Sequence, residues 1–242
     1  MQTAPEYWEK QAYYRNKVKY FSNLTRVLNG PYKGLKYPLS ESHGSAFYPK
    51  IFGTYEQELT PFFSDGIKRS YSTVVDIGCA EGYHSIGLGR LYSADVFAFD
   101  TSRSAQESCS NMAALNDVNL TIGGLCTTET LLQLPLGKRA IILIDCEGYE
   151  LELLSQKVAE DLKYHDFVIE CHDFKNITTS AQILSCFIET HDLSEVLSTD
   201  DIQKAYSYEV SELEGFSLDD KYFYLSESRP TIMKWVIAKS RN

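Results

Sequence analysis

The chain has 242 residues, 43% of them hydrophobic, which suits one globular domain with an elaboration better than two independent units. Its 23 Lys and Arg residues stand against 33 Asp and Glu residues, which gives a formal net charge of -10. Because no run of Lys and Arg is long enough to follow a phosphate backbone, we expect no nucleic-acid partner.

The composition of the N-terminus and the spacing of the cysteines favour a cytoplasmic protein. Residues 1–6 lack an apolar secretion core, and no uncharged apolar run approaches the length of a membrane span. The six cysteines are scattered without C-x-x-C spacing, so we expect neither a disulfide framework nor a zinc site. We therefore expect a cytoplasmic location and no membrane span.

Residues 1–65 are predicted to form a helical and irregular extension in front of a main domain over 66–242. Apolar residues at helical spacing predict an amphipathic helix over 6–29, and Gly, Pro, Ser and Tyr predict an irregular segment over 31–53. Thr54 and Gln57 have the spacing of a capping box for a short helix through Phe63. Seven tyrosines here suit a lid or sugar-stacking wall, or else core packing or a homo-oligomer interface: Tyr13, Tyr14, Tyr20, Tyr32, Tyr37, Tyr48 and Tyr55.

A buried strand over residues 73–77 leads into a glycine turn that opens a helix. The run reads Val74-Val75-Asp76-Ile77-Gly78-Cys79-Ala80-Glu81-Gly82-Tyr83-His84. Gly78 and Gly82 let the backbone approach a ligand closely, and Asp76 at the strand end accepts hydrogen bonds from a cationic or hydroxylated group. This arrangement predicts a cradle for a nucleotide-like cofactor, although such turns are also a common structural device in α/β proteins.

The next strand, over residues 95–99, ends in Asp100, about 20 residues beyond the turn, where open α/β sheets place the acid that binds ribose hydroxyls. Gly78-x-x-x-Gly82 lacks the G-x-G pair that fits a pyrophosphate against the helix start. The spacing therefore favours a cofactor without phosphates, such as S-adenosylmethionine.

Beyond Tyr71, short apolar runs alternate with helical stretches. Strands are predicted over 73–77, 95–99, 119–122, 140–145, 166–171, 193–198 and 231–238, and helices over about 82–92, 103–116, 148–162, 178–190 and 218–225. This alternation is typical of an α/β fold with a doubly wound, mainly parallel, seven-stranded sheet. The last two strands need no helical crossover if they pair antiparallel, so we expect an antiparallel edge.

Acidic residues follow two of these strands. The apolar run over 140–144 ends in Asp145, with Glu147 just beyond, and the strand over 166–171 carries Glu170 with His172 after it. Ligands of open α/β sheets bind at the carboxyl ends of strands, so we expect these four side chains to face the same crevice as Gly78 and Asp100.

Two chemical interpretations of Asp145, Glu147, Glu170 and His172 stay open. Either they include a general base that takes a proton from a substrate hydroxyl, or some of them hold a divalent cation such as Mg²⁺ that orients and acidifies that hydroxyl. His172 is the best single candidate for the base, because its ordinary pKa lies near neutrality. Strand-end acids also cap the next helix in many proteins, which is the structural alternative for each residue taken singly.

Together these segments resemble the class I S-adenosylmethionine-dependent methyltransferases, and within them the FkbM-like methyltransferases. The resemblance rests on Asp76-Ile77-Gly78-Cys79-Ala80-Glu81-Gly82-Tyr83, on Ile144-Asp145-Cys146-Glu147-Gly148-Tyr149-Glu150-Leu151 and on Val168-Ile169-Glu170, and covers residues 72 to 200. Leu143 stands where the family usually has Lys, and Asp100-Thr101 where it usually has Glu-Pro.

The resemblance implies a Rossmann-like methyltransferase fold and an enzyme that methylates a hydroxyl of a sugar, glycan or secondary metabolite. It also implies a cofactor site around Asp76, Gly78, Cys79, Ala80, Gly82, Tyr83, Asp100, Thr101 and Asp145, and catalysis by Asp145, Glu147, Glu170 and His172. Three alternatives stay open: methylation of nitrogen, an NAD-dependent oxidoreductase, and a noncatalytic cofactor-binding or scaffold protein.

Overall fold

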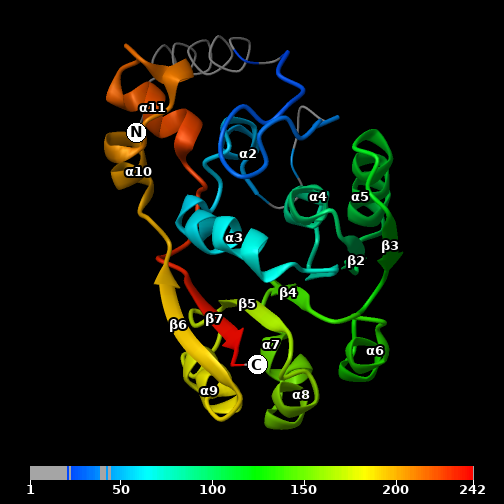
Figure 1. Cartoon of the computed structure of the whole chain (residues 1–242). Coiled ribbons are helices and arrows are strands. Elements are labelled where there is room, and N and C mark those ends of the chain that lie inside the picture. Colours follow the sequence, from blue (N-terminus) through cyan, green and yellow to red (C-terminus); the bar gives the residue numbers. More distant parts are fainter. Residues whose placement is uncertain (1–20, 22, 39–41, 43–44, 242) are drawn as a thin grey trace.

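A seven-stranded sheet forms the centre of the molecule. The computed structural model describes residues 21, 23–38, 42 and 45–241. The strands lie in the order β3-β2-β1-β4-β5-β7-β6, and β7 runs antiparallel to both of its neighbours (Figure 1). Their bounds are β1 (Thr73–Ile77), β2 (Asp95–Phe99), β3 (Leu120–Gly123), β4 (Ala140–Ile144), β5 (Asp166–Cys171), β6 (His191–Leu197) and β7 (Lys234–Ser240). The fold is therefore the predicted doubly wound, mainly parallel α/β sheet.

The register of the central strands brings their carboxyl ends to one edge. Ile77 at the end of β1 lies beside Phe99 of β2 on one side and Ile144 of β4 on the other. Strands β1 and β4 are buried along their whole length, as their unbroken apolar runs predict for central strands covered on both faces. The residues that follow β1, β2 and β4 consequently emerge next to one another.

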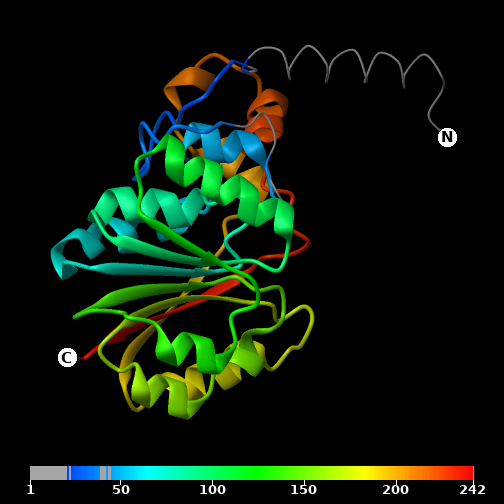
Figure 2. The ribbon, with the colours of Figure 1, turned by 90° about the vertical axis from the view of Figure 1, so that its right-hand side faces the viewer.

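Helices cover both faces of the sheet (Figure 2). On one face, alternate strand residues such as Val74 and Ile141 share a hydrophobic cluster with Ile86 and Met112. On the other face, Val75 and Ile142 belong to a second cluster. The helices of the first face are α3 (Thr60–Gly66), α4 (Tyr83–Tyr92) and α5 (Arg103–Leu115); those of the second are α6 (Thr128–Gln133), α7 (Glu150–Leu153), α8 (Gln156–Asp161) and α9 (Thr179–Phe187).

A cap lies beyond the carboxyl-terminal edge of the sheet. Its larger part is the β6–β7 insertion, residues 198–233, which holds α10 (Asp201–Ser207), the short 3-10 helix η3 (Ser211–Leu213) and α11 (Leu218–Leu225). The insertion packs on α2 (Phe47–Phe52) through an aromatic and aliphatic cluster that includes Phe52, Tyr224 and Leu225. The cap thus joins two segments that lie far apart in the sequence.

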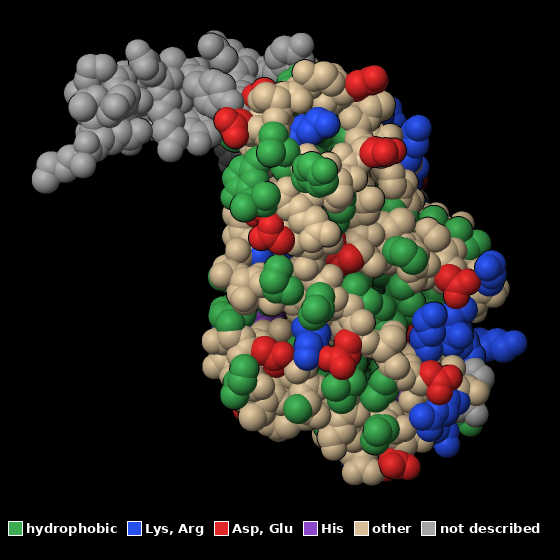
Figure 3. Space-filling model, turned by 90° about the vertical axis from the view of Figure 1, so that its left-hand side faces the viewer, with side chains coloured by type: hydrophobic (Ala, Val, Ile, Leu, Met, Phe, Trp, Pro, Cys, Tyr) green, Lys and Arg blue, Asp and Glu red, His purple; other side chains and the backbone are tan. Residues whose placement is uncertain are grey.

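Charge is unevenly spread over the surface. Figure 3 shows Lys and Arg side chains gathered along one side of the face that it presents. Lys68 and Lys239 both lie near Asp65, at nitrogen–oxygen distances of 3.2 and 3.8 Å, close to the end of β7. This end of β7 lies at the amino-terminal edge of the parallel strands, far from the carboxyl-terminal edge. Lys68 and Lys239 lie far apart in the sequence, so only folding brings them together. Among the described residues, no helix is long and apolar enough to cross a membrane.

Several N-terminal expectations are wrong. The helix predicted over 6–29 is absent from its described part, because Arg26 instead forms a β-bridge with Lys36; residues 6–20 and 22 lie outside the described residues. The segment 31–53, predicted to be irregular, contains α2. Thr54 does not cap a helix, since its hydroxyl donates to the carbonyl of Pro49, and 3-10 helices (η1, Gln57–Leu59; η2, Ile67–Arg69) flank α3.

The main domain follows the predicted order with three differences. The helix predicted over 148–162 is divided into α7 and α8, because Leu154 adopts an extended conformation and Ser155 caps α8. Helices α6 and α10 lie in segments without a predicted helix, each with a side-chain cap from Thr127 or Asp200. Strand β7 is antiparallel as expected, but it lies inside the sheet, and β6 forms the edge.

Candidate functional site

A cavity of about 750 Å³ opens at the carboxyl-terminal edge of the sheet. This volume lies within the range of small-molecule sites. Its wall comes from the ends of β1, β2, β4 and β5, from residues 45–59, and from residues 227–235 of the insertion and β7. We call the part beside β1 and β2 the turn side, and the part beside β5 and the cap the cap side.

Gly78 lets the ends of β1 and β4 meet on the turn side. Its φ is +93°, and a Cβ atom at this position would lie 1.6 Å from the carbonyl oxygen of Asp145. No other residue fits this close approach, because every other side chain has a Cβ. Gly82 also has a positive φ, but it starts α4 against Cys109 and does not line the cavity.

Asp100 holds the turn that follows β1. Its carboxylate accepts hydrogen bonds from the backbone N–H groups of Ala80 at 2.9 Å and of Ser102 at 2.8 Å. Ala80 has a φ of +47°, which is strained for a residue with a side chain. The carboxylate predicted to bind ribose therefore faces the cavity next to the turn, as an acceptor fixed by two backbone donors.

Apolar groups complete the turn side. Phe99, Ala105 and Cys126 line the cavity there, together with Leu125, whose side chain is 56% exposed. Ligand pockets are lined mainly by apolar side chains, so this wall suits an apolar part of a ligand. Asp76 lies deeper: burial raises its pKa, and it accepts a hydrogen bond from Ser85.

Asp145 and Glu170 form a carboxyl pair between the two sides. The Oδ1 atom of Asp145 is buried although 44% of the side chain is exposed, and burial, followed by the charge of Glu56, raises the pKa of Asp145 to about 6. Burial, followed by the charge of Asp145, raises the pKa of Glu170 well above its usual range. The two carboxyls are close neighbours, so the negative charge of Asp145 opposes ionisation of Glu170.

His172 is held by Glu150, a residue that the sequence reasoning gave no role. The Nδ1 atom of His172 lies 2.7 Å from Oε1 of Glu150, and both side chains are almost completely buried. Burial opposes protonation of His172, but the hydrogen bond and charge of Glu150, with the charges of Asp145 and Glu147, outweigh it and raise the pKa. Glu150 also accepts from the backbone N–H of Gly148 at 3.0 Å, so its position is fixed.

Three of the four predicted catalytic side chains converge. The Nε2 atom of His172 lies 3.6 Å from Oδ1 of Asp145 and 3.5 Å from Oε2 of Glu147. Candidate ligand atoms of these three residues lie within 4.8 Å of one another, which is close enough for one metal ion or one hydroxyl group. A metal ion at this position would compete with Lys175 for the carboxylate of Glu147, since the Nζ of Lys175 lies 2.6 Å from Oε2 of Glu147. Glu170 is not among these three residues: it neighbours Asp145, and its Oε1 contacts Arg229.

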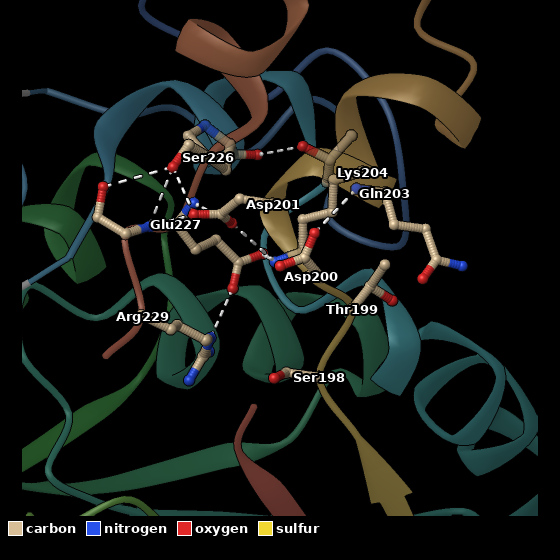
Figure 4. Close-up of polar contacts among 12 residues, drawn as sticks. Ser198, Thr199, Asp200, Asp201, Gln203, Lys204, Ser226, Glu227 and Arg229 are labelled. Atoms are coloured by element: carbon tan, nitrogen blue, oxygen red, sulfur yellow. Dashed lines mark hydrogen bonds and ion pairs between the residues drawn. The ribbon is translucent and has the colours of Figure 1, made fainter. Parts of the chain in front are cut away.

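Arg229 organises the cap side, and the sequence reasoning did not identify it. Its guanidinium contacts three carboxylates: Glu170 at 2.5 Å, Glu56 at 2.6 Å and Glu227 at 2.8 Å. It also lies over the ring of Trp235, 4.7 Å from the ring centroid. Figure 4 shows Glu227 between Arg229 and Lys204 of α10; the Lys204 Nζ lies 2.5 Å from Glu227 Oε1. The insertion has no motif that signals this arrangement.

Lys50 and Glu81 form a second buried pair that the sequence reasoning missed. The Lys50 Nζ atom lies 2.5 Å from Glu81 Oε1, and the hydroxyls of Tyr37 and Ser42 donate to the same oxygen. Because Glu81 belongs to the glycine turn and Lys50 to α2, the pair attaches the N-terminal segment to the turn side. Tyr32, Tyr37 and Tyr48 are packing residues, and Tyr55 lines the cavity.

Backbone strain is concentrated at the cavity. Among the described residues, seven other than glycine have a positive φ, and four of them line the cavity: Glu56, Ala80, Glu147 and Ser228. Such conformations persist only where the surroundings enforce them, and they are common at ligand sites. The strain therefore marks the same wall as the buried charges do.

The cavity brings together nearly all predicted site residues. Those that line it are Asp76, Gly78, Cys79, Ala80, Tyr83, Asp100, Thr101, Asp145, Glu147, Glu170 and His172. Gly82 is the exception. The geometry thus places the fixed carboxylate of Asp100 and an apolar wall in the same cavity as a cluster of titratable groups.

Comparison with solved structures identifies a shared fold. A crystal structure of WbdD matches with a TM-score of 0.50 at 14% identity, over 76% of this chain and 40% of the WbdD chain. A second structure, described as the bifunctional kinase-methyltransferase WbdD, matches with a TM-score of 0.51 at 14% identity, over 77% and 39%. A precorrin-6y C5,15-methyltransferase from Geobacter metallireducens matches with a TM-score of 0.46 at 14% identity, over 75% and 89%.

These matches concern the fold. The chain spans about 40% of the length of WbdD. No protein-family model matches the chain, and no curated protein matches it in sequence. The sheet order and the likeness to WbdD together give the chain a seven-stranded Rossmann-like methyltransferase fold.

Proposed function

We propose that this protein is an S-adenosylmethionine-dependent methyltransferase of the FkbM-like type, which methylates a hydroxyl of a sugar, glycan or secondary metabolite in the cytoplasm. The observation that carries the proposal is the single cavity that joins Asp100 and the strained turn to Asp145, Glu147 and His172. When bound, S-adenosylmethionine supplies the methyl group from its sulfonium.

The turn side fits the adenosyl part of this cofactor. Asp100 provides the acceptor for ribose hydroxyls, and Phe99, Leu125 and Cys126 provide an apolar wall for the adenine ring. The other cofactor residues in this proposal are Asp76, Gly78, Cys79, Ala80, Tyr83, Thr101 and Asp145, while Gly82 shapes the turn behind them.

The cap side fits an acceptor that must lose a proton. His172 donates its Nδ1 hydrogen to Glu150 in the neutral form, which leaves Nε2 free to take a proton beside Asp145 and Glu147. Positioning of the reacting oxygen lowers the activation barrier of such a reaction by roughly 7–11 kcal/mol. A general base increases the rate by about 10²–10⁴-fold. Asp145, Glu147, Glu170 and His172 are the proposed catalytic residues.

The cofactor assignment is tested by Asp100→Ala. We expect calorimetric affinity for S-adenosylhomocysteine to fall about 10–100-fold, because one charge-assisted contact of roughly 1.5–3 kcal/mol is lost. Asp95→Ala is the matched control, since Asp95 lies at the other end of β2 and binds Asn119. Equal affinities of all three proteins would remove Asp100 from the ribose role.

The catalytic assignment is tested by His172→Ala and Glu147→Ala, assayed for release of S-adenosylhomocysteine with a panel of hydroxylated acceptors. We expect turnover to fall at least 100-fold while cofactor affinity stays within about threefold. Turnover at the parental rate by both variants would show that the group around His172 is not catalytic.

A divalent cation such as Mg²⁺ held by Asp145, Glu147 and His172 is the second chemical proposal, supported by the convergence of their ligand atoms. It requires a neutral His172 and displacement of Lys175 from Glu147. Chelator treatment separates the two proposals: loss of turnover that Mg²⁺ restores supports the metal, and undiminished turnover supports the base alone.

A further inference from the structure

The charges on the cavity wall restrict the acceptor. Of the wall residues that the structure describes, seven are acidic: Glu56, Asp76, Asp100, Asp145, Glu147, Glu170 and Glu227. Four are basic: Lys50, His84, His172 and Arg229. An anionic ligand at this wall needs a basic group whose donors are available, so the pairing of these four residues decides which ligands fit.

Each of the four basic groups already has a carboxylate partner. Lys50 contacts Glu81 at 2.5 Å, and His84 contacts Glu56 at 2.8 Å. His172 contacts Glu150 at 2.7 Å. Arg229, the residue best suited to bind phosphate or carboxylate, has all three of its nitrogen atoms directed at carboxylates.

These partners are fixed rather than exchangeable. The second carboxylate oxygen of Glu56 accepts a hydrogen bond from His84. The second carboxylate oxygen of Glu227 contacts buried Lys204. It also accepts a hydrogen bond from the backbone N–H of Glu56 at 3.0 Å. The side chains of Glu56, Glu170 and Glu227 are at most 5% exposed. An anionic acceptor would have to displace one of these carboxylates and would then lie beside the others, where like charges repel strongly because little water screens them.

We propose that the acceptor carries no anionic group where it meets the cap side, so that it is an uncharged polyhydroxy compound, such as a glycoside, and not a nucleotide-linked or phosphorylated sugar. This inference rests on the proposed function and narrows its substrate class. Hydroxyl groups suit the wall, because they donate to carboxylates without adding charge. The carboxylates around Arg229 act as selectivity groups that exclude anions.

Anion binding tests the inference without methyl transfer. Trp235 lines the cavity next to Arg229, and the chain has 2 Trp residues, so Trp8→Phe leaves Trp235 as the single fluorescent reporter. In this background we titrate inorganic phosphate and pyrophosphate at constant ionic strength. We expect no saturable change in Trp235 fluorescence at anion concentrations below about 10 mM, which corresponds to a binding free energy weaker than roughly 3 kcal/mol.

Removing one carboxylate is expected to create the missing anion site. In Glu56→Gln, Arg229 and His84 each lose an anionic partner, and we expect pyrophosphate affinity to rise at least tenfold over the parent. Glu107→Gln, a change on the exposed surface of α5, is the matched control and is expected to behave as the parent. Adding Arg229→Gln to Glu56→Gln should abolish the gain.

Two results would overturn the inference: saturable pyrophosphate binding by the parent that Arg229→Gln removes, or turnover of a nucleotide-linked or phosphorylated sugar at a rate above that of the matching methyl glycoside. A parent that binds no S-adenosylhomocysteine would refute the proposed function instead. The anion titrations remain interpretable in that case, because they need neither cofactor nor acceptor.

Discussion

At the scale of single residues, the protonation of His172 decides whether this side chain can be the proposed base. Three carboxylates surround the imidazole and raise its pKa, which favours the charged form that cannot accept a proton. A base at this position therefore operates on the alkaline side of its ordinary pKa. The same carboxylates give it a fixed orientation, because Glu150 binds only Nδ1.

The Glu150 contact predicts a specific pH profile. In the parent, kcat/KM should rise with pH through the raised pKa of His172, since only the neutral imidazole accepts the acceptor proton. Glu150→Gln removes a charge that favours protonation, so the rise should move to lower pH. The maximal rate should fall about 10–100-fold, because the ring loses its fixed orientation. NMR titration of the His172 ring and rate measurements over pH check both effects.

Two further variants separate orientation from general damage to α7. Glu152→Gln changes an exposed glutamate of the same helix and should leave both the pKa of His172 and the rate unchanged. Glu150→Asp keeps the charge and should retain most of the raised pKa. An unchanged His172 pKa in Glu150→Gln would contradict the proposed positioning role.

At the scale of elements, the sequence predicted the sheet better than the cap. The β1 and β4 runs are apolar throughout, a pattern specific to central parallel strands, and their ends place Asp76 and Asp145 correctly. The caps that start α6 and α10 are single side chains, Thr127 and Asp200, without a long periodic segment after them. Short helices of this kind form because tertiary packing stabilises them, and local patterns rarely reveal them.

The candidate site likewise has residues that the sequence predicted and residues that it did not. Residues that follow a strand, such as Asp100 and His172, could be located because strand ends meet at one edge. Arg229 and Glu56 lie in segments without periodicity, and their ion pair joins positions 173 residues apart. Such a contact depends on how the insertion packs against α2, which no local signal in the chain encodes.

The buried pair of Lys204 and Glu227 predicts how firmly the insertion is held. Both side chains are fully buried, so Lys204→Met leaves Glu227 with Arg229 as its remaining cationic partner. We expect a loss of roughly 3 kcal/mol in the free energy of unfolding, because the buried carboxylate of Glu227 loses one of its two cationic partners. Urea denaturation measures this change.

The matched control is Lys157→Met. Lys157 forms an equally close ion pair with Asp161 at 2.6 Å, but both side chains are exposed, so water screens the pair and we expect little change in the free energy of unfolding. A Lys204→Met protein as stable as this control would mean that the pair does not hold the insertion in place.

At the scale of the whole molecule, the described part of the N-terminal segment, the cap and the sheet behave as one structure. Val27, Tyr37 and Phe63 belong to the same core cluster as Val74 of β1 and Trp235 of β7. Glu56 links these parts electrostatically, since it contacts His84 of α4 and Arg229 of the insertion. The ionisation of one buried carboxyl is therefore coupled to the stability of the entire fold.

This coupling predicts acid sensitivity. Burial opposes ionisation of Glu56, but the charges and hydrogen bonds of His84 and Arg229 outweigh it and lower the pKa from 4.5 to about 2. A carboxyl with a lowered folded-state pKa binds more protons when unfolded, so its contribution is complete above pH 4.5 and is lost as pH falls through 2. Between pH 6 and pH 3, Glu56 alone should account for about 2 kcal/mol of the loss in unfolding free energy.

Glu56→Gln removes this titration and isolates its contribution. The variant should be less stable than the parent at pH 6, yet its unfolding free energy should decrease less between pH 6 and pH 3, by about 2 kcal/mol. Glu107→Gln, which replaces a carboxylate with an exposed side chain, should retain the pH dependence of the parent. Parallel pH profiles for all three proteins would mean that the pKa of Glu56 is the same in the folded and unfolded states, so that His84 and Arg229 do not stabilise its ionised form.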